Sequence, residues 1–228
     1  MKKILVSGLI ALMLLSIAVF SEHQVNTFEP DKDSKVAKAQ SNANFGLGVH
    51  GIVNDKQTGT DRIYQHFDLS NSGLASVNNA DIEMFVYWTG SQVVGSVIQA
   101  WYCDNTDFGE ATITWNNQPK QWDVNGNPIT ITPTLLYGKY LVYRTTAGNG
   151  CVLADSYTVP NKVIAGTPET KHFFDLTPEV NNELANGDGR FTVVLKHDTE
   201  NMPNNYKYVQ YLMREYSESA YRPQLVIS

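Results

Sequence analysis

Short runs of alternating apolar and polar residues constrain the fold of this chain more than any other feature. Every second residue is apolar from Ile82 to Trp88, and Phe191–His197 repeats the pattern. Successive residues of a β-strand point to opposite faces of its sheet, so this spacing predicts strands with one buried face. Further strands are predicted at the other apolar runs: Val93–Cys103, Lys207–Glu215 and Gln224–Ile227.

Clusters of turn-forming residues separate these runs. Glycine, asparagine, serine and proline favour the backbone angles and local hydrogen bonds of tight turns. The clusters lie at Asn71–Gly73, Asn125–Pro128, Gly148–Gly150 and Asn186–Gly189. Many short strands with turns at such intervals predict an all-β fold, a jelly-roll-like antiparallel β-sandwich.

One short helix is predicted at Thr177–Asn186. Thr177 is a good N-cap residue, and Pro178 suits the first helical position because its missing N–H has no partner there. Gly187 follows as a residue that can end the helix. So short a helix is marginal in water, so packing against the sandwich must stabilise it.

The N-terminus has the pattern of a secretory signal. Lys2 and Lys3 precede an almost wholly apolar run from Ile4 to Phe20. We expect residues 1–21 to be a cleaved signal peptide, with an uncleaved membrane anchor as the alternative. Residues 22–44 are expected to hold an N-terminal segment and the first strand, within one domain at 26–228. The protein is therefore expected to be secreted, or attached to the cell surface if the anchor is kept.

Cys103 and Cys151 are the two cysteines of the chain. In an exported protein they predict one disulfide, with two buried free thiols as the alternative. A bridge that closes so long a loop stabilises a fold by about 4 kcal/mol in the chain-entropy model.

The formal charge of the chain is −6 at pH 7, and it becomes −8 when Lys2 and Lys3 leave with the signal. An acidic domain repels phosphate backbones, so nucleic acid is not an expected partner. The same charge disfavours a densely anionic polysaccharide unless a local basic patch offsets it. No segment after the signal is apolar for long enough to cross a membrane.

Several motifs resemble one family and occur in its order. The motifs are Thr27–Val36, Asn44–Gly46, Arg62–Ser70, Thr114–Pro119, Phe174–Val180, Arg214–Glu215 and Arg222–Pro223. Together they resemble the DNRLRE, or disaggregatase-related, domain of carbohydrate-binding module family 96, as in surface proteins of methanogenic archaea. The most specific motif is Thr114–Pro119. Gln65 departs from the pattern, because the family usually has an aliphatic residue there, and 121–170 matches poorly.

The resemblance implies a β-sandwich that binds an extracellular or cell-envelope polysaccharide without altering it. Two other functions stay open. The first is a structural surface or matrix protein that self-associates, with Glu22–Asn44 adding a strand to the sheet of a neighbour. The second is a polysaccharide-cleaving enzyme, which the name disaggregatase suggests.

Candidate binding residues lie on the strand faces that we expect to point away from the core. Tyr64 and His66 would combine with Lys196 to offer an aromatic ring, an imidazole and an ammonium group to an acidic glycan. Trp122, in the divergent region, is the fourth candidate. An ordinary solvated strand face is the alternative. Trp115 is interpreted as a core plug at a corner of the sandwich rather than as a sugar-stacking residue.

No metal or other cofactor is expected, and calcium is the weaker alternative. Asp104–Asp107 with Glu110, and Asp123–Asn127, carry oxygen ligands of the kind calcium takes, but turn chemistry explains them more simply. Catalysis is not expected, because the chain has no nucleophile elbow, zinc motif or phosphate loop. Asp107, Glu110 and Asp198 would be the acids of a glycoside hydrolase if two of them met in space.

Overall fold

The computed structural model describes residues 25–56, 59–104, 108–118, 134–136, 140–142, 151–164, 170–200, 202 and 207–228. Strands are the main regular structure among these residues, which confirms the predicted all-β class. The expected signal peptide at 1–21 lies outside the described residues. Within the described part of the chain, none of the helices has the length and apolar character needed to span a bilayer.

Eleven strands form one antiparallel sheet in the order β1-β13-β5-β12-β3-β4-β11-β6-β9, with β10 added to β5 and β2 added to β4. Their bounds are β1 Asn26–Phe28, β2 Lys32–Ala37, β3 His50–Asn54, β4 Asp61–Asp68, β5 Ala80–Thr89, β6 Val97–Asp104, β9 Cys151–Thr158, β10 Lys171–Asp175, β11 Arg190–His197, β12 Tyr208–Leu212 and β13 Gln224–Ile227. A separate hairpin consists of β7 Thr134–Leu136 and β8 Tyr140–Val142.

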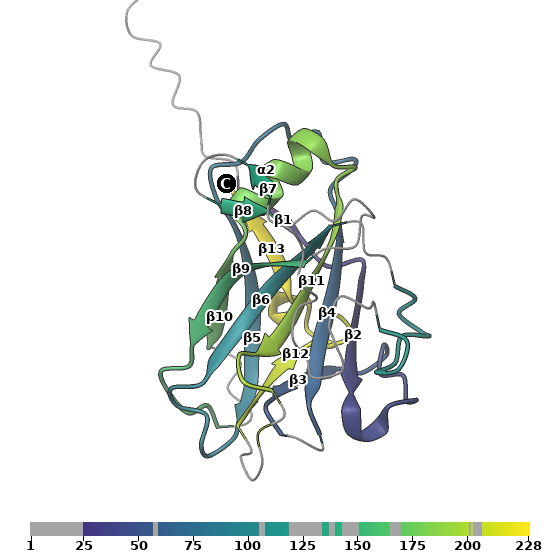
Figure 1. Ribbon diagram of the computed structural model, residues 1–228, viewed down its shortest axis with the longest axis vertical. Helices are drawn as coiled ribbons and strands as arrows, with labels where there is room; N and C mark the ends of the chain where they lie inside the picture. The colour runs from purple at the N-terminus through teal and green to yellow at the C-terminus, as the bar shows by residue number, and fades with distance from the viewer. Residues whose placement is uncertain are drawn as a thin grey trace, which may run out of the picture.

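Strand β5 joins the two layers of the sandwich because it changes partners along its length. Its first half pairs with β13 and β10, and its second half pairs with β12. On the other side, β4, β11 and β6 are neighbours, and Figure 1 shows them side by side with the helix at one end of the sandwich. The sheet therefore curls, and its two halves face each other as the predicted sandwich.

The main core fills the space between these halves. Ile63 and Phe67 of β4 belong to the same buried cluster as Ile82 of β5 and Tyr211 of β12. Phe191 of β11 stacks on Phe67 with 5.6 Å between ring centres. Burying one such side chain contributes about 1.5–3 kcal/mol. The predicted inward set on β11, with Phe191 at its start, is confirmed.

Helix α2 spans Thr177–Asn186, as predicted. The predicted N-cap is wrong, because Leu176 occupies that position and makes no side-chain cap hydrogen bond. The hydroxyl of Thr177 instead accepts the N–H of Ala80 at 2.9 Å and so ties the helix to β5. Gly187 ends the helix as expected, and its N–H donates to the carbonyl of Glu183 at 2.8 Å. Two short 3-10 helices, η1 (Lys38–Gln40) and η2 (Ser219–Tyr221), complete the described elements.

The N-terminal strands are already paired within the chain. Strand β1 pairs with β13, and β2 pairs with β4 along its whole length. The self-association alternative required Glu22–Asn44 to be a free strand. In the described part of this segment, β1 and β2 are held in these pairs and are therefore not free strands.

The predicted disulfide is confirmed. Cys103 of β6 and Cys151 of β9 lie directly opposite each other, with their Cα atoms 4.1 Å apart and a sequence separation of 48. The bridge therefore locks the two strands at one edge of the sheet.

Candidate functional site

The predicted binding face lies on neighbouring strands, but it is buried. Tyr64 pairs with Val194 and His66 pairs with Thr192, so β4 and β11 are adjacent as the hypothesis required. Tyr64 is fully buried, and His66 and Lys196 are each only 4% exposed. The expectation that these three side chains face solvent is therefore wrong. Trp122 lies outside the described residues.

A second layer of packing covers this face. We call residues 108–118 the cap segment. Phe108 and Ile113 of the cap segment pack on the outer side of the sheet, with Trp101 and Trp115 against them. This second apolar cluster contains Val36, Tyr64, Cys103, Phe108, Ile113, Cys151 and Val194. Alternation had marked one side of β4 and β11 as external, but a distant part of the chain folds back over that side.

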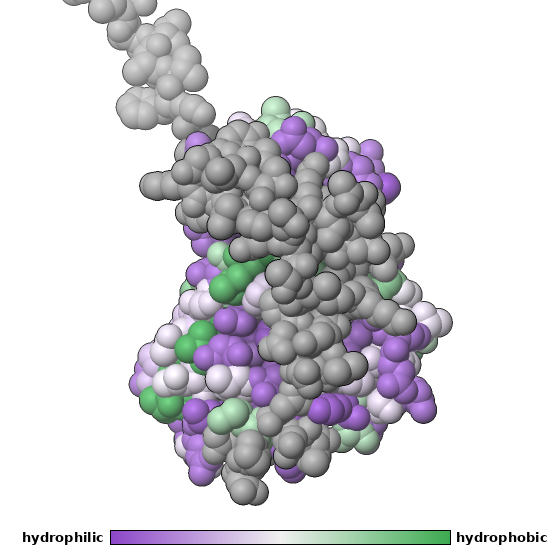
Figure 2. Space-filling view, in the orientation of Figure 1, coloured by the Kyte–Doolittle hydropathy of each residue, from purple (hydrophilic) through white to green (hydrophobic). Residues whose placement is uncertain are grey.

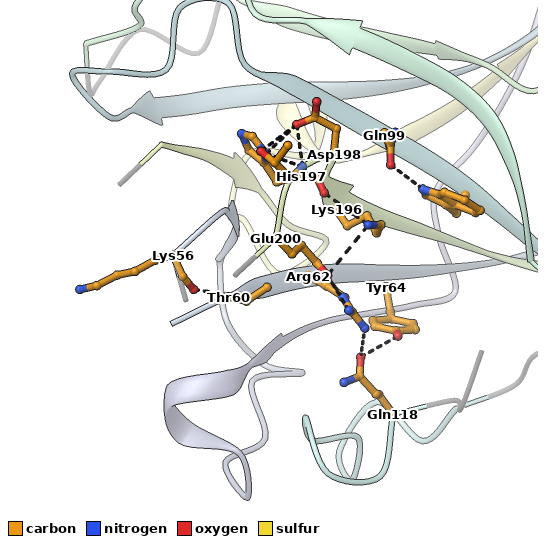
Figure 3. A network of polar contacts seen from close by, with 12 residues as sticks. Lys56, Thr60, Arg62, Tyr64, Gln99, Gln118, Lys196, His197, Asp198 and Glu200 are labelled. Atoms are coloured by element: carbon orange, nitrogen blue, oxygen red, sulfur yellow. Dashed lines mark hydrogen bonds and ion pairs between the residues drawn. The ribbon is translucent and has the colours of Figure 1, made fainter. Parts of the chain in front are cut away.

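Buried charges under the cap segment are paired with one another (Figure 3). Arg62 donates from Nε and Nη2 to the two oxygens of Glu200 at 2.8 and 2.7 Å, and both side chains are 2% exposed. Lys196 lies 3.9 Å from the same carboxylate. Burial lowers the pKa of Lys196, since the charged ammonium is poorly solvated there. Lys196 therefore neutralises a buried acid rather than offering its charge to a ligand.

Residues 114–118 of the cap segment hold it in place. Trp115 is half-buried, and the guanidinium of Arg62 stacks over its ring at 4.8 Å. The Oε1 of Gln118 accepts hydrogen bonds from Tyr64 at 2.8 Å and from Arg62 at 3.1 Å. Asn117 donates to the carbonyl of Thr112 at 2.9 Å and closes the turn. These contacts support the interpretation of Trp115 as a plug.

The outer face of the other half-sheet carries many aromatic side chains. We call this surface the aromatic face. Its members lie on or beside β10, β5, β12 and β3: Phe173, Phe85, Tyr87, Trp88, Tyr208, His50, Tyr216 and Tyr221. Phe173 and Trp88 are 45% and 42% exposed. Three tyrosines are half-buried between them, so flat rings are presented to solvent on a rigid sheet.

A β-bulge turns Trp88 outward. Tyr211 pairs with Val86 while Gln210 pairs with Trp88, so Tyr87 is an extra residue on β5. A bulge shifts the alternation by one residue. The sequence pattern predicted Trp88 on the core face with Ile82, and that prediction is wrong for this reason. The edge of the Trp88 ring packs against Tyr208, with 5.8 Å between ring centres.

A hollow of about 520 Å³ lies beside the aromatic face. It is lined by Pro160, Asn161, Lys162, Val163, Ile164, Thr170 and His172. Val86 donates its N–H to Thr170, and Thr89 donates its N–H to Val163, so the lining joins β5 on both sides of Trp88. In Figure 2, which shows one side of the molecule, apolar residues of the described chain form small separate patches among polar ones.

Polar groups accompany the aromatic rings. The ammonium of Lys171 lies 2.5 Å from Glu83 and 4.7 Å from the centre of the Phe85 ring. His50 stacks at a tilt on Tyr87 with 4.3 Å between ring centres, and burial lowers its pKa. The face therefore combines apolar rings with a few hydrogen-bonding groups, a mixture typical of small-molecule sites.

Two of the three candidate catalytic acids contact basic side chains in the structure. Both oxygens of Glu110 accept hydrogen bonds from Nη2 of Arg214, at 2.7 Å each. Asp198 lies 2.9 Å from His197, and Asp107 lies outside the described residues. Glu110 comes close to Asp33 and Glu215 instead, in an acidic cluster that could hold a metal ion. Of the two segments considered for calcium, Glu110 alone enters this cluster, and Asp123–Asn127 lies outside the described residues.

Comparison with known proteins finds a family match in the N-terminal part of the chain. Residues 24–135 match the model of carbohydrate-binding module family 96, which supports a carbohydrate-binding module domain there. The matched segment includes β1 to β6, and with them Trp88 of the aromatic face. No curated protein matches the chain.

Proposed function

We propose that this protein, whose residues 24–135 match carbohydrate-binding module family 96, is a secreted module that binds polysaccharide through its aromatic face and does not cleave it. The observation that carries the proposal is the pair of exposed rings, Trp88 and Phe173, on one outer sheet face. The apolar side of a sugar ring packs well on a flat aromatic ring. Its hydroxyl groups need nearby donors and acceptors such as Gln210, which pairs with Trp88.

The chemistry of the face favours weak binding to a polymer. A few rings on an open surface bury little of a glycan, so one site is expected to bind with micromolar affinity or weaker. An extended polysaccharide can contact Trp88 and the neighbouring hollow together, with Lys162 at the hollow available to a carboxylate. A cell-envelope or matrix polysaccharide therefore suits the site better than a free monosaccharide.

Affinity electrophoresis in gels that contain soluble polysaccharides would test the proposal. Trp88→Ala and Phe173→Ala should each weaken retardation at least about tenfold, because each removes a stacking surface. The matched control is Leu153→Ala, which removes a 44% exposed apolar side chain from β9. Retardation of both aromatic variants equal to that of the parent would reject the aromatic face as the site.

Self-association through the same surface is the second candidate function. Exposed aromatic clusters also mark protein interfaces, so Trp88 and Phe173 suit either partner. Sedimentation velocity without glycan separates the two functions. A monomer that binds polysaccharide supports the first, and a concentration-dependent oligomer abolished by Trp88→Ala supports the second. The absence of sugar release from retained polysaccharides would distinguish both functions from a cleaving enzyme.

A further inference from the structure

Three carboxylates from distant parts of the chain meet beside strand β2. They belong to Asp33 of β2, Glu110 of the cap segment and Glu215 after β12, and one oxygen of each lies within 4.8 Å of the others. The backbone holds them in place. The N–H of Asp33 donates to Oε1 of Glu110 at 2.9 Å, and the N–H of Arg214 donates to Oδ2 of Asp33 at 2.7 Å.

The charge of this cluster is not balanced by the side chains around it. Arg214 contacts Glu110 at 2.7 Å and Glu215 at 3.1 Å, so it supplies one positive charge against three negative ones. Asp33 is fully buried. Burial of a charge that lacks a counter-charge is costly. Two positive charges would neutralise the cluster.

Two oxygens of these carboxylates are buried without a hydrogen-bond partner among the described residues. They are Oδ1 of Asp33 and Oε2 of Glu215. Gln65 pairs with Asp33 across β2 and β4, so both side chains lie on the same sheet face. Its fully buried amide also has no partner for either atom within the described chain. Two buried oxygens and one buried amide therefore lack the partners that folded proteins normally supply.

We propose that Asp33, Glu110 and Glu215 bind one divalent cation, Ca²⁺, with the amide oxygen of Gln65 as a fourth ligand. The donors are all hard oxygens, which calcium prefers. The three ligand oxygens lie within 4.8 Å of one another, so they can all reach one ion at the calcium–oxygen distance of about 2.4 Å.

The ion would link three segments that the sequence places far apart. It would hold β2, the cap segment and the chain after β12 at one point. Asn44 strengthens this junction, because its amide donates to the carbonyls of Glu110 and Ile113 at 2.7 and 2.8 Å. A side chain on Gly46 would clash with the Glu110 carbonyl, only 2.0 Å from an added Cβ. Bound calcium would therefore stabilise the seating of the cap segment on the sheet.

Thermal unfolding of the purified protein, followed by circular dichroism, tests the site. The Tm in 10 mM CaCl₂ should exceed the Tm in EDTA by about 5 °C, as expected for a millimolar-to-submillimolar site in a chain of this size. Asp33→Asn keeps an oxygen acceptor for the N–H of Arg214 but removes a ligand charge, and Glu215→Gln does the same at the second position. Each variant should lose most of the rise.

Glu218→Gln is the control, because it removes one exposed negative charge close to the cluster in sequence. It should retain the full rise in Tm. If the parent has the same Tm in EDTA and in CaCl₂, the proposal is overturned. The two acids Asp33 and Glu215 would then be stabilised by sharing a proton instead of a metal ion. A rise retained by both ligand variants would also overturn it. An equal rise with MgCl₂ would overturn the assignment to calcium. None of these outcomes depends on sugar binding, so the glycan proposal is tested separately.

Discussion

At the residue scale, two arginine–carboxylate pairs of the sheet differ mainly in exposure. Arg62 and Glu200 are each 2% exposed, whereas Arg190 and Asp68 are 50% and 31% exposed. Removing one partner of a buried pair leaves a buried charge without its counter-charge. We expect Arg62→Met to lower the free energy of unfolding by about 3 kcal/mol in urea denaturation.

The exposed pair is the matched comparison for this prediction. Water and salt screen Arg190, so Arg190→Met should change the free energy of unfolding little. Similar losses for the two variants would mean that the burial of Arg62 under the cap segment has no energetic consequence.

At the scale of elements, the disulfide joins β6 to β9 on the side covered by the cap segment. Both sulfurs belong to the second apolar cluster with Val194 and Ile113. Reduction with TCEP should lower the free energy of unfolding by about 4 kcal/mol, through the greater entropy of the unfolded chain. The double variant Cys103→Ala/Cys151→Ala should show the same loss and no response to TCEP. A parent unaffected by TCEP, although its thiols are shown to be reduced, would contradict the prediction.

Local sequence patterns predicted the strands and the helix better than they predicted which side chains are buried and which are exposed. The alternation on β11 and the helix at Thr177–Asn186 follow from short-range signals, and the Cys103–Cys151 bridge follows from the presence of two cysteines in a chain expected to be exported. The burial of Tyr64 could not be predicted, because its cover comes from a distant segment. The outward turn of Trp88 depends on one extra residue in β5, which alternation alone does not reveal. Phe85 and Tyr87, both predicted on the same outer side, were the one local sign of the aromatic face.

At the scale of the whole molecule, buried titrating groups set the pH dependence of stability. Burial raises the pKa values of Asp61 and Glu179 to about 7, above their ordinary values near 4. The folded state therefore holds these protons up to pH 7, and their contribution to stability is lost as the pH rises through 7. Burial lowers the pKa of His172 to about 4, so its contribution is lost as the pH falls from 6.5 towards 4.

The unfolded chain releases the two carboxyl protons near pH 4, and two carboxyl groups outweigh one histidine, so stability in EDTA should already be falling as the pH rises from about 4.5 to 6.5. Between pH 6.5 and 8 the free energy of unfolding should fall by about 2 kcal/mol from Asp61 and Glu179 together. Urea denaturation across this range measures the fall, and Asp61→Asn/Glu179→Gln should make the slope shallower. Stability that rises over this interval would show that both carboxylates are ionised in the folded protein.

The pairing of β1 with β13 determines where a tether fused to either end of the folded chain meets the sandwich. Asn26 lies opposite Ile227, so the two ends of the folded chain leave from adjacent positions on one strand ladder. A tether fused before Asn26 or after Ile227 would pull on the same corner of the sandwich. A protein that anchors the molecule to a surface could therefore be fused to either end of the chain, and the aromatic face would keep the same orientation towards that surface.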